Sequence, residues 1–183
     1  MSISLARQVA SQSQKKVVLI DADLRRPQIH KNLGFPLSPG LVEYLSGNAQ
    51  IEEILHRDEA SGVIVICAGG TPHNPTDVLA SDQMRRLVHR LAEANDLVII
   101  DSPPVLAVSD PKVLSRLADK TVYVIRWAET RRETVMTGLK QILDVGSDVA
   151  GVVLSMVNVR RHSQYGYGDS GAYYGAARKY YTR

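Results

Sequence analysis

Three aspartates stand where apolar segments of the chain end. Asp21 closes the apolar run 17–21 and is followed two residues later by Asp23, while Asp101 closes the run 97–101. A carboxylate at the end of a buried strand is costly unless something compensates its charge. A hydrated magnesium ion that carries phosphate oxygens is a suitable partner, because Mg²⁺ in proteins is bound by one or two carboxylates plus substrate phosphates. The sequence therefore predicts a phosphate-handling magnesium site.

A simpler interpretation is that each aspartate caps the helix or turn that follows it. For one aspartate, the two interpretations have about equal weight; three at equivalent ends of apolar segments favour the shared cation. We predict Asp21, Asp23 and Asp101 to be both catalytic and metal-binding. The two arginines that follow, Arg25 and Arg26, are predicted to bind the cofactor's phosphates, and their alternative is a solvated surface position.

The pattern of apolar residues indicates the elements that must position these side chains. Continuous runs rich in Val and Ile are typical of parallel strands buried on both faces, and helical periodicity separates several of them. The predicted strands are 17–21, 63–67, 97–101, 121–126 and 149–155, and the predicted helices are 81–94, 110–117 and 130–143. Asp110 and Pro111 are expected to cap and open the second helix. We predict an α/β fold with a mostly parallel sheet flanked by helices.

In such a sheet, ligands bind at the carboxyl ends of the strands, where the three aspartates are predicted to lie.

The chain has 183 residues, 44% of them hydrophobic and 22% charged, which suits one domain and argues against wholesale disorder. Its one cysteine excludes an intrachain disulfide. No apolar stretch reaches the ~18 residues of a membrane span, and the first residues lack a signal-peptide pattern, so the expected compartment is the cytosol.

The last 25 residues differ from the rest of the chain. Residues 159–183 hold five basic side chains and one aspartate, a net charge of +4, whereas the whole chain has +3. Six of the eight tyrosines lie here: Tyr165, Tyr167, Tyr173, Tyr174, Tyr180 and Tyr181. We predict a domain over 1–158 and a flexible tyrosine-rich tail over 159–183. A nucleic-acid-stacking segment is the alternative for the tail, but no basic patch or RNA-binding motif supports it, and no nucleic-acid partner is expected.

Several motifs resemble those of the bacterial tyrosine kinases (BY-kinases) of polysaccharide export systems. Residues 17–27 are similar to the family's second Walker-A-type motif, and residues 97–105 to its Walker B motif. Residues 40–47 and 69–79 also match the family's pattern, as does the tyrosine-rich tail. The resemblance covers essentially the whole chain, in order. It implies a P-loop-NTPase-like fold of the deviant Walker type.

The resemblance also implies an activity. The family transfers the γ-phosphoryl group of ATP, with Mg²⁺, to tyrosines on the tail of a neighbouring copy, and this autokinase activity regulates exopolysaccharide or capsule synthesis and export. Asp23 and Asp101 would then hold magnesium, directly or through water, and Asp21 would orient the tyrosine hydroxyl and accept its proton. Asn158, after the last predicted strand, would lie near the adenine, and the six tail tyrosines would be phosphoacceptors.

The partners follow from the same resemblance. They are other copies of the chain in a ring-like oligomer, a membrane adaptor of the polysaccharide co-polymerase type and a tyrosine phosphatase. The expected location is the cytoplasm, at the inner face of the plasma membrane, through that adaptor.

One departure from the family pattern is large. The sequence has no Gly-x-x-x-x-Gly-Lys-[Ser/Thr] loop, and residues 2–12 resemble the helix that follows this loop in the family. We therefore expect the sheet to lack the strand before the loop, so that neighbouring strands have unpaired edges, and the chain alone to be inactive. The alternatives are a non-catalytic pseudokinase or fragment that serves as a phosphoacceptor and interaction module, and a partitioning-type ATPase.

Overall fold

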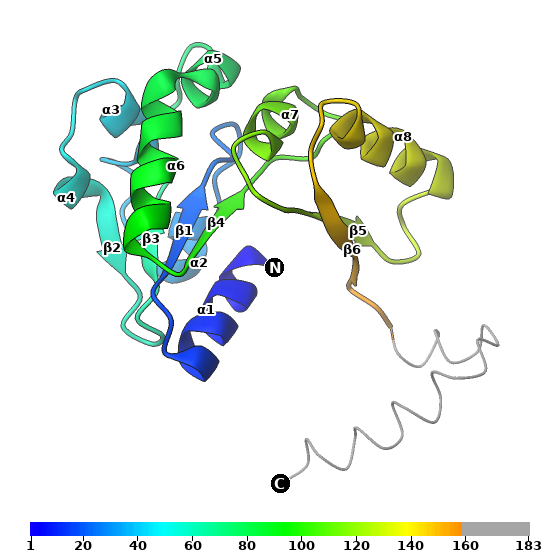
Figure 1. The fold of residues 1–183 in the computed structure, drawn as a ribbon. Coiled ribbons are helices and arrows are strands. Elements are labelled where there is room, and N and C mark those ends of the chain that lie inside the picture. The colour runs from blue at the N-terminus through cyan, green and yellow to red at the C-terminus, as the bar shows by residue number, and fades with distance from the viewer. Residues whose placement is uncertain (159–183) are drawn as a thin grey trace, which may run out of the picture.

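The computed structural model describes residues 1–158 and shows an α/β fold with a mostly parallel sheet flanked by helices (Figure 1). The tyrosine-rich segment 159–183, with its six predicted phosphoacceptors, lies outside the described residues. The helices are α1 (Ser2–Ser13), α2 (Ile29–Leu33), α3 (Leu41–Leu45), α4 (Ile51–Ile54), α5 (Pro75–Ala80), α6 (Asp82–Ala94), α7 (Asp110–Ser115) and α8 (Arg132–Leu143). The strands are β1 (Val17–Asp21), β2 (Leu55–Arg57), β3 (Ile64–Ile66), β4 (Leu97–Asp101), β5 (Thr121–Arg126) and β6 (Val149–Ser155).

Strand β1 is the centre of the main sheet and separates two hydrophobic cores. The order of this sheet is β2-β3-β1-β4, in which β3 and β4 run parallel to β1 and β2 pairs antiparallel with β3. Val18 and Ile20 pack into a core that includes Met84 of α6. Val17 and Leu19 belong to a second core, which contains Ala6 of α1. All five residues of β1 are buried, so the prediction of burial on both faces is confirmed for this strand.

The predicted elements agree closely with those in the structure. Four predicted strands have the observed bounds, and the fifth, 63–67, is observed as the shorter β3. Helix α6 begins one residue later than predicted, because Ser81 is its N-cap and accepts a hydrogen bond from the amide of Met84 at 3.2 Å. The predicted helices 110–117 and 130–143 are shorter, as α7 and α8. Strand β2 and the short helices α2 to α5 were not predicted, because elements this short do not show a clear hydrophobic periodicity.

Strands β5 and β6 form a separate two-stranded parallel sheet, and no described strand joins β5 to β4. Within residues 1–158, β4 and β5 therefore each have an edge without a strand partner, as the sequence predicted. The prediction of burial on both faces is wrong for β5 and β6: Val122, Val124 and Val153 are exposed. In β5 the exposed residues alternate with half-buried ones, because α8 packs on the Tyr123 side, where a Cβ on Gly138 would collide with the Tyr123 hydroxyl, and Val122 and Val124 face the other way.

No helix within residues 1–158 is long and apolar enough to cross a membrane.

The glycine-rich segments 40–47 and 69–79 meet at the carboxyl end of β3. The Glu43 carboxylate accepts hydrogen bonds from the amides of Gly40 at 2.7 Å and of Gly70 at 2.9 Å. These bonds lower the pKa of Glu43 although burial, the largest influence, acts to raise it. The backbone comes so close here that a Cβ on Gly40 would lie 2.5 Å from the Cys67 carbonyl oxygen. The start of α3 therefore packs directly against the loop that follows β3.

This close approach predicts that Gly40→Ala destabilises the fold by about 2–3 kcal/mol, because backbone atoms must move to admit the methyl group. Gly151→Ala is the matched control, since no atom lies within 4 Å of the position of its Cβ. Urea unfolding of the two variants measures the difference. An equal free energy of unfolding for both variants contradicts the prediction.

Candidate active site

The structure brings the three predicted aspartates to one edge of the main sheet. Asp21 and Asp101 are partners in the parallel register of β1 and β4, each at the last residue of its strand. Asp23 follows two residues after β1. The Asp23 and Asp101 charges each act to raise the pKa of Asp21, so the three carboxylates share one electrostatic environment. The apolar strands β1 and β4 thus place the aspartates at the edge of the sheet where parallel sheets bind ligands.

Asp21 is the most deeply buried member of this group. Its side chain is fully buried, and Oδ2 accepts a hydrogen bond from the Ile29 amide at 3.1 Å. Oδ1 is also buried and has no hydrogen-bond partner among the described residues. Burial raises the pKa of Asp21 to about 6, since a low-dielectric environment disfavours the charged form. Near neutral pH the carboxylate is therefore ionised but able to accept a proton.

Asp101 and Asp23 are held differently. Burial raises the pKa of Asp101, and a hydrogen bond from Ser2 at the start of α1 opposes this effect. Asp23 is half-buried, and its Oδ1 accepts hydrogen bonds from the backbone amides of Arg25 at 3.2 Å and Arg26 at 3.0 Å. These bonds fold the chain into a tight turn directly after β1. Asp23 is thus anchored through one oxygen.

The aspartates fit a hydrated magnesium ion better than a fully protein-enclosed metal. Within residues 1–158, no three His, Cys, Asp or Glu side chains are grouped to hold a metal by themselves. Mg²⁺ usually keeps several waters and needs only one or two carboxylates. The unpartnered Oδ1 of Asp21 is a further acceptor that a water ligand or a hydroxyl group could satisfy. The donor set is therefore compatible with Mg²⁺.

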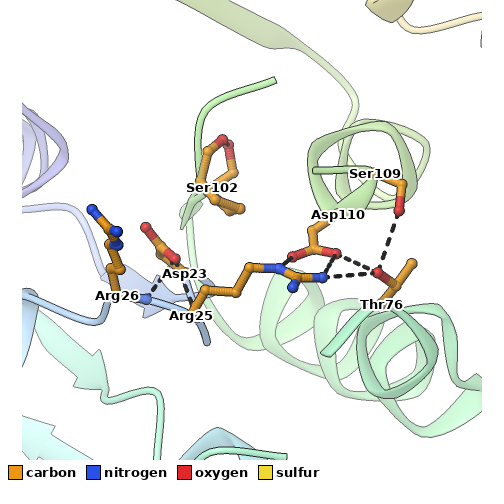
Figure 2. Close-up of polar contacts among 8 residues, drawn as sticks. Asp23, Arg25, Arg26, Thr76, Ser102, Ser109 and Asp110 are labelled. Carbon is orange, nitrogen blue, oxygen red and sulfur yellow. Dashed lines mark hydrogen bonds and ion pairs between the residues drawn. The ribbon is translucent and has the colours of Figure 1, made fainter. Parts of the chain in front are cut away.

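The two arginines after β1 have different surroundings. The Arg25 side chain leads away from Asp23 to α7, where Nε lies 2.7 Å and Nη2 3.2 Å from the two carboxylate oxygens of Asp110 (Figure 2). Arg26 is exposed, and its guanidinium lies on the opposite side of Asp23 from Asp110 (Figure 2). The structure thus gives Arg25 an internal partner and leaves Arg26 facing solvent.

Asp110 has a role that the sequence analysis missed. It was predicted to cap the helix 110–117, and that prediction is wrong: Ser109 is the N-cap residue, and Asp110 is the first residue of α7. Its fully buried carboxylate binds Arg25 and accepts a hydrogen bond from the Thr76 hydroxyl at 2.5 Å. An aspartate before a proline at a helix start is a common capping pattern, and no local signal distinguishes this long-range partner.

The remaining predicted residues lie elsewhere. Asn158 lies three residues after the end of β6, the second strand of the two-stranded sheet. Its side chain is exposed. Tyr165, Tyr167, Tyr173, Tyr174, Tyr180 and Tyr181 lie outside the described residues.

A mostly parallel sheet flanked by helices, with acidic side chains at the carboxyl ends of its central strands, defines an α/β fold that solved ATP-binding proteins share. A structural neighbour with this fold is cobyrinic acid a,c-diamide synthase from Mycobacterium smegmatis with bound ATP analogue and magnesium. It is 22% identical, with a TM-score of 0.69 over 84% of this chain and 65% of that chain, a likeness that shows the fold alone. The chain matches no protein-family model.

Closer relatives define the family. The tyrosine-protein kinase YwqD of Bacillus subtilis is 33% identical over 159 residues, 87% of this chain and 67% of that protein. The kinase domain of the Escherichia coli tyrosine kinase Etk is 35% identical, with a TM-score of 0.81 over 84% of this chain and 60% of that chain. The chain therefore belongs to the bacterial tyrosine-protein kinases. A longer relative, the putative tyrosine-protein kinase EpsB of Ralstonia solanacearum, is 36% identical over 92% of this chain, which spans 22% of its length.

The raised pKa of Asp21 gives a pH-dependent stability. Between its ordinary value of 3.8 and about 6, the folded chain binds a proton that the unfolded chain has released, so stability falls as the pH rises through this window. The loss amounts to about 3 kcal/mol, since one pKa unit corresponds to about 1.4 kcal/mol. Asp21→Asn removes this titration. We expect the variant to gain stability relative to the parent between pH 4.5 and pH 7 in urea unfolding.

The difference between the parent and the variant is the quantity to compare, because carboxylates such as Asp58 and Asp110 have lowered pKa values and add the opposite slope to both proteins. A difference that does not change with pH contradicts the prediction.

Proposed function

We propose that this chain is the acidic, magnesium-binding part of an ATP-dependent protein-tyrosine kinase domain. The observation that carries the proposal is the register of Asp21 with Asp101 at the ends of β1 and β4, with Asp23 close enough to interact electrostatically with both. Membership of the tyrosine-kinase family supports the type of reaction. The proposed cofactors are ATP and Mg²⁺.

The three carboxylates are proposed to have different roles, because their surroundings differ. Asp23 and Asp101 are proposed to hold Mg²⁺, directly or through water. When bound there, Mg²⁺ neutralises charge on the phosphate oxygens. Arg26 is exposed and beside Asp23, so it is the arginine proposed to meet phosphate. Asn158 remains a proposed adenine contact, supported by the resemblance alone.

Asp21 is proposed to orient the acceptor tyrosine. In the transfer, the bond between the γ-phosphorus and the oxygen that bridges it to the β-phosphate breaks, and a bond from the phenolic oxygen to that phosphorus forms, releasing ADP. The phenolic proton, with an ordinary pKa near 10, must leave during or after the attack. A carboxylate with a pKa of about 6 accepts it more readily than an ordinary aspartate, and Oδ1 of Asp21, which is buried and has no hydrogen-bond partner among the described residues, is the oxygen proposed to receive it.

The absence of a Gly-x-x-x-x-Gly-Lys-[Ser/Thr] loop from the sequence limits what residues 1–183 can do alone. Such a loop supplies backbone amides to phosphates, a lysine to the β- and γ-phosphates and a hydroxyl to magnesium. Without these groups, the three aspartates face the negative charge of a nucleotide with little compensation. We propose that residues 1–183 alone bind Mg·ATP negligibly, and that activity requires a strand and P-loop added before residue 1.

The wider setting is also proposed. Residues 1–158 form the kinase-domain part and residues 159–183 the phosphoacceptor tail, whose tyrosines are modified by a neighbouring copy. Each phosphate adds a charge of about −1.5 to −2, so two or more would offset the positive charge of the tail. The proposed partners are other copies of the chain, a polysaccharide co-polymerase type adaptor at the inner face of the plasma membrane and a tyrosine phosphatase. The regulated process is exopolysaccharide or capsule synthesis and export.

The second candidate function is a non-catalytic module that serves as a phosphoacceptor and interaction partner. The separation of β5 and β6 from the main sheet favours it, because among residues 1–158 no strand connects β4 to β5 into one continuous sheet.

A chimaera separates the two functions. The strand and P-loop segment of Bacillus subtilis YwqD is fused before residue 2, and binding of Mg·ADP is measured by calorimetry beside that of residues 1–183. We expect micromolar binding by the chimaera, no detectable binding by the parent chain, and phosphotyrosine formation when the chimaera is given Mg·ATP. Asp23→Ala and Asp101→Ala in the chimaera should each weaken Mg·ADP binding at least about tenfold.

Circular dichroism and thermal unfolding establish that each protein is folded, and the equivalent Etk segment serves as a second donor. Micromolar Mg·ADP binding by residues 1–183 alone overturns the account of the missing loop. A chimaera that binds nucleotide equally well without Asp23 and Asp101 overturns the assignment of the carboxylates. Nucleotide binding without phosphotyrosine supports the non-catalytic module.

A further inference from the structure

Asp110 connects three segments that lie far apart in the sequence. Its carboxylate receives two hydrogen bonds from the Arg25 guanidinium and one from the Thr76 hydroxyl. Thr76 lies on α5 and Asp110 begins α7, whereas Arg25 follows β1. Figure 2 shows the Arg25 side chain extended from the turn at Asp23 to these two helix starts. We call this set of contacts the Asp110 clamp.

The surroundings of the Asp110 clamp make its contacts specific. The Asp110 side chain is 0% exposed, and that of Arg25 is 39% exposed. A fully buried carboxylate needs its hydrogen-bond donors, because losing one leaves the charge uncompensated. The guanidinium supplies two nearly parallel donors in a fixed geometry, which sets the direction of the Arg25 side chain as well as its charge. The Arg25 Nη2 also lies 3.4 Å from the Thr76 hydroxyl oxygen.

The same residue fixes the backbone at Asp23. The Arg25 amide donates to Asp23 Oδ1, and the amide of Arg26 donates to the same oxygen. The side chain of Arg25 thus holds one end of the turn while its backbone holds the carboxylate of Asp23. A displacement of the Arg25 backbone, which the side-chain contacts with Asp110 oppose, would move a donor on which the orientation of Asp23 depends.

We propose that Asp110 is a positioning residue for Asp23 and acts through Arg25. The inference rests on the proposed function, in which Asp23 holds the metal. Residues that orient a metal ligand commonly change metal affinity about 10–100-fold when they are replaced, although they do not touch the metal. Arg25 accordingly acts on the site through its contacts with Asp110 and Asp23, and the hydrogen bond from Thr76 on α5 holds Asp110 in position.

The chain contains a matched control for this proposal. Arg7 and Asp58 form a second two-bond ion pair between distant segments, with Nε–Oδ2 at 2.8 Å and Nη2–Oδ1 at 2.9 Å. The Asp58 side chain is 9% exposed and that of Arg7 44%, similar to the Asp110 clamp. This pair ties α1 to the turn between β2 and β3, and neither of its two hydrogen bonds involves Asp23 or a residue of its turn. Replacing it tests the loss of a comparable ion pair without the proposed positioning.

The test compares Asp110→Asn with Asp58→Asn in residues 1–183. The first readout is hydrogen exchange, by NMR, of the Arg25 and Arg26 amides that bind Asp23. We expect Asp110→Asn to speed this exchange about tenfold relative to the Leu19 amide of β1, because the turn opens locally. Asp58→Asn should leave the ratio unchanged. Arg25→Lys, which keeps the charge but loses the two-bond geometry, should give an intermediate effect and serves if Asp110→Asn does not fold.

The second readout is the affinity for Mn²⁺ in the presence of ADP, measured by electron paramagnetic resonance on the YwqD chimaera carrying each substitution, with Mn²⁺ as a probe for Mg²⁺. We expect Asp110→Asn to weaken Mn²⁺ binding about tenfold and Asp58→Asn, whose ion pair holds α1 and not the Asp23 turn, to weaken it less. Unchanged exchange at Arg25 and Arg26 in Asp110→Asn, or equal effects of both variants, overturns the positioning role. If the unsubstituted chimaera binds no Mn²⁺ with ADP while the exchange result holds, the proposed metal site fails and the positioning of Asp23 stands.

Discussion

The central constraint on this fold is the cost of holding negative charge at the end of a buried strand. Strand β1 is apolar along its length and lies between two cores, yet it ends in a carboxylate that is fully buried. The neighbouring strand ends in the same way at Asp101. Backbone amides and the start of α1 offset part of this charge, and the raised pKa values of Asp21 and Asp101 show that the remainder is not compensated by the protein.

Other carboxylates of the fold are stabilised by hydrogen bonds to residues that lie far away in the sequence. Glu43 binds two loop amides, and Asp110 binds a cation and a hydroxyl group. Both carboxylates have lowered pKa values, in contrast to Asp21 and Asp101. The acidic residues thus divide into two kinds. Those with full sets of donors stabilise the loops, and those with incomplete sets are left at the edge of the sheet, where a ligand can complete them.

The sequence was sufficient to predict five of the six described strands, the placement of Asp21 and Asp101 at one edge of the sheet, and the family, because continuous apolar runs and the segment 17–27 are strong local signals. It was not sufficient for Asp110, whose partner lies 85 residues away and whose local context is that of a helix cap. Burial of β5 and β6 was predicted wrongly for a related reason. Periodicity reports which residues are apolar, whereas exposure depends on which element covers each face, and that is a property of the whole sheet.

The exposed valines of β5 and β6 affect how the polypeptide behaves in solution. Val122, Val124, Val152 and Val153 are exposed on a two-stranded sheet whose strands carry one charged side chain, Arg126. No described strand pairs with the outer edge of β5 or of β6. Proteins usually protect such edges with charges, prolines or a covering helix, because open backbone donors and acceptors recruit strands from other molecules. Purified at high concentration, the chain is therefore prone to form intermolecular β-sheets through this region, and dilute samples or an added lysine on β6 would keep it monodisperse.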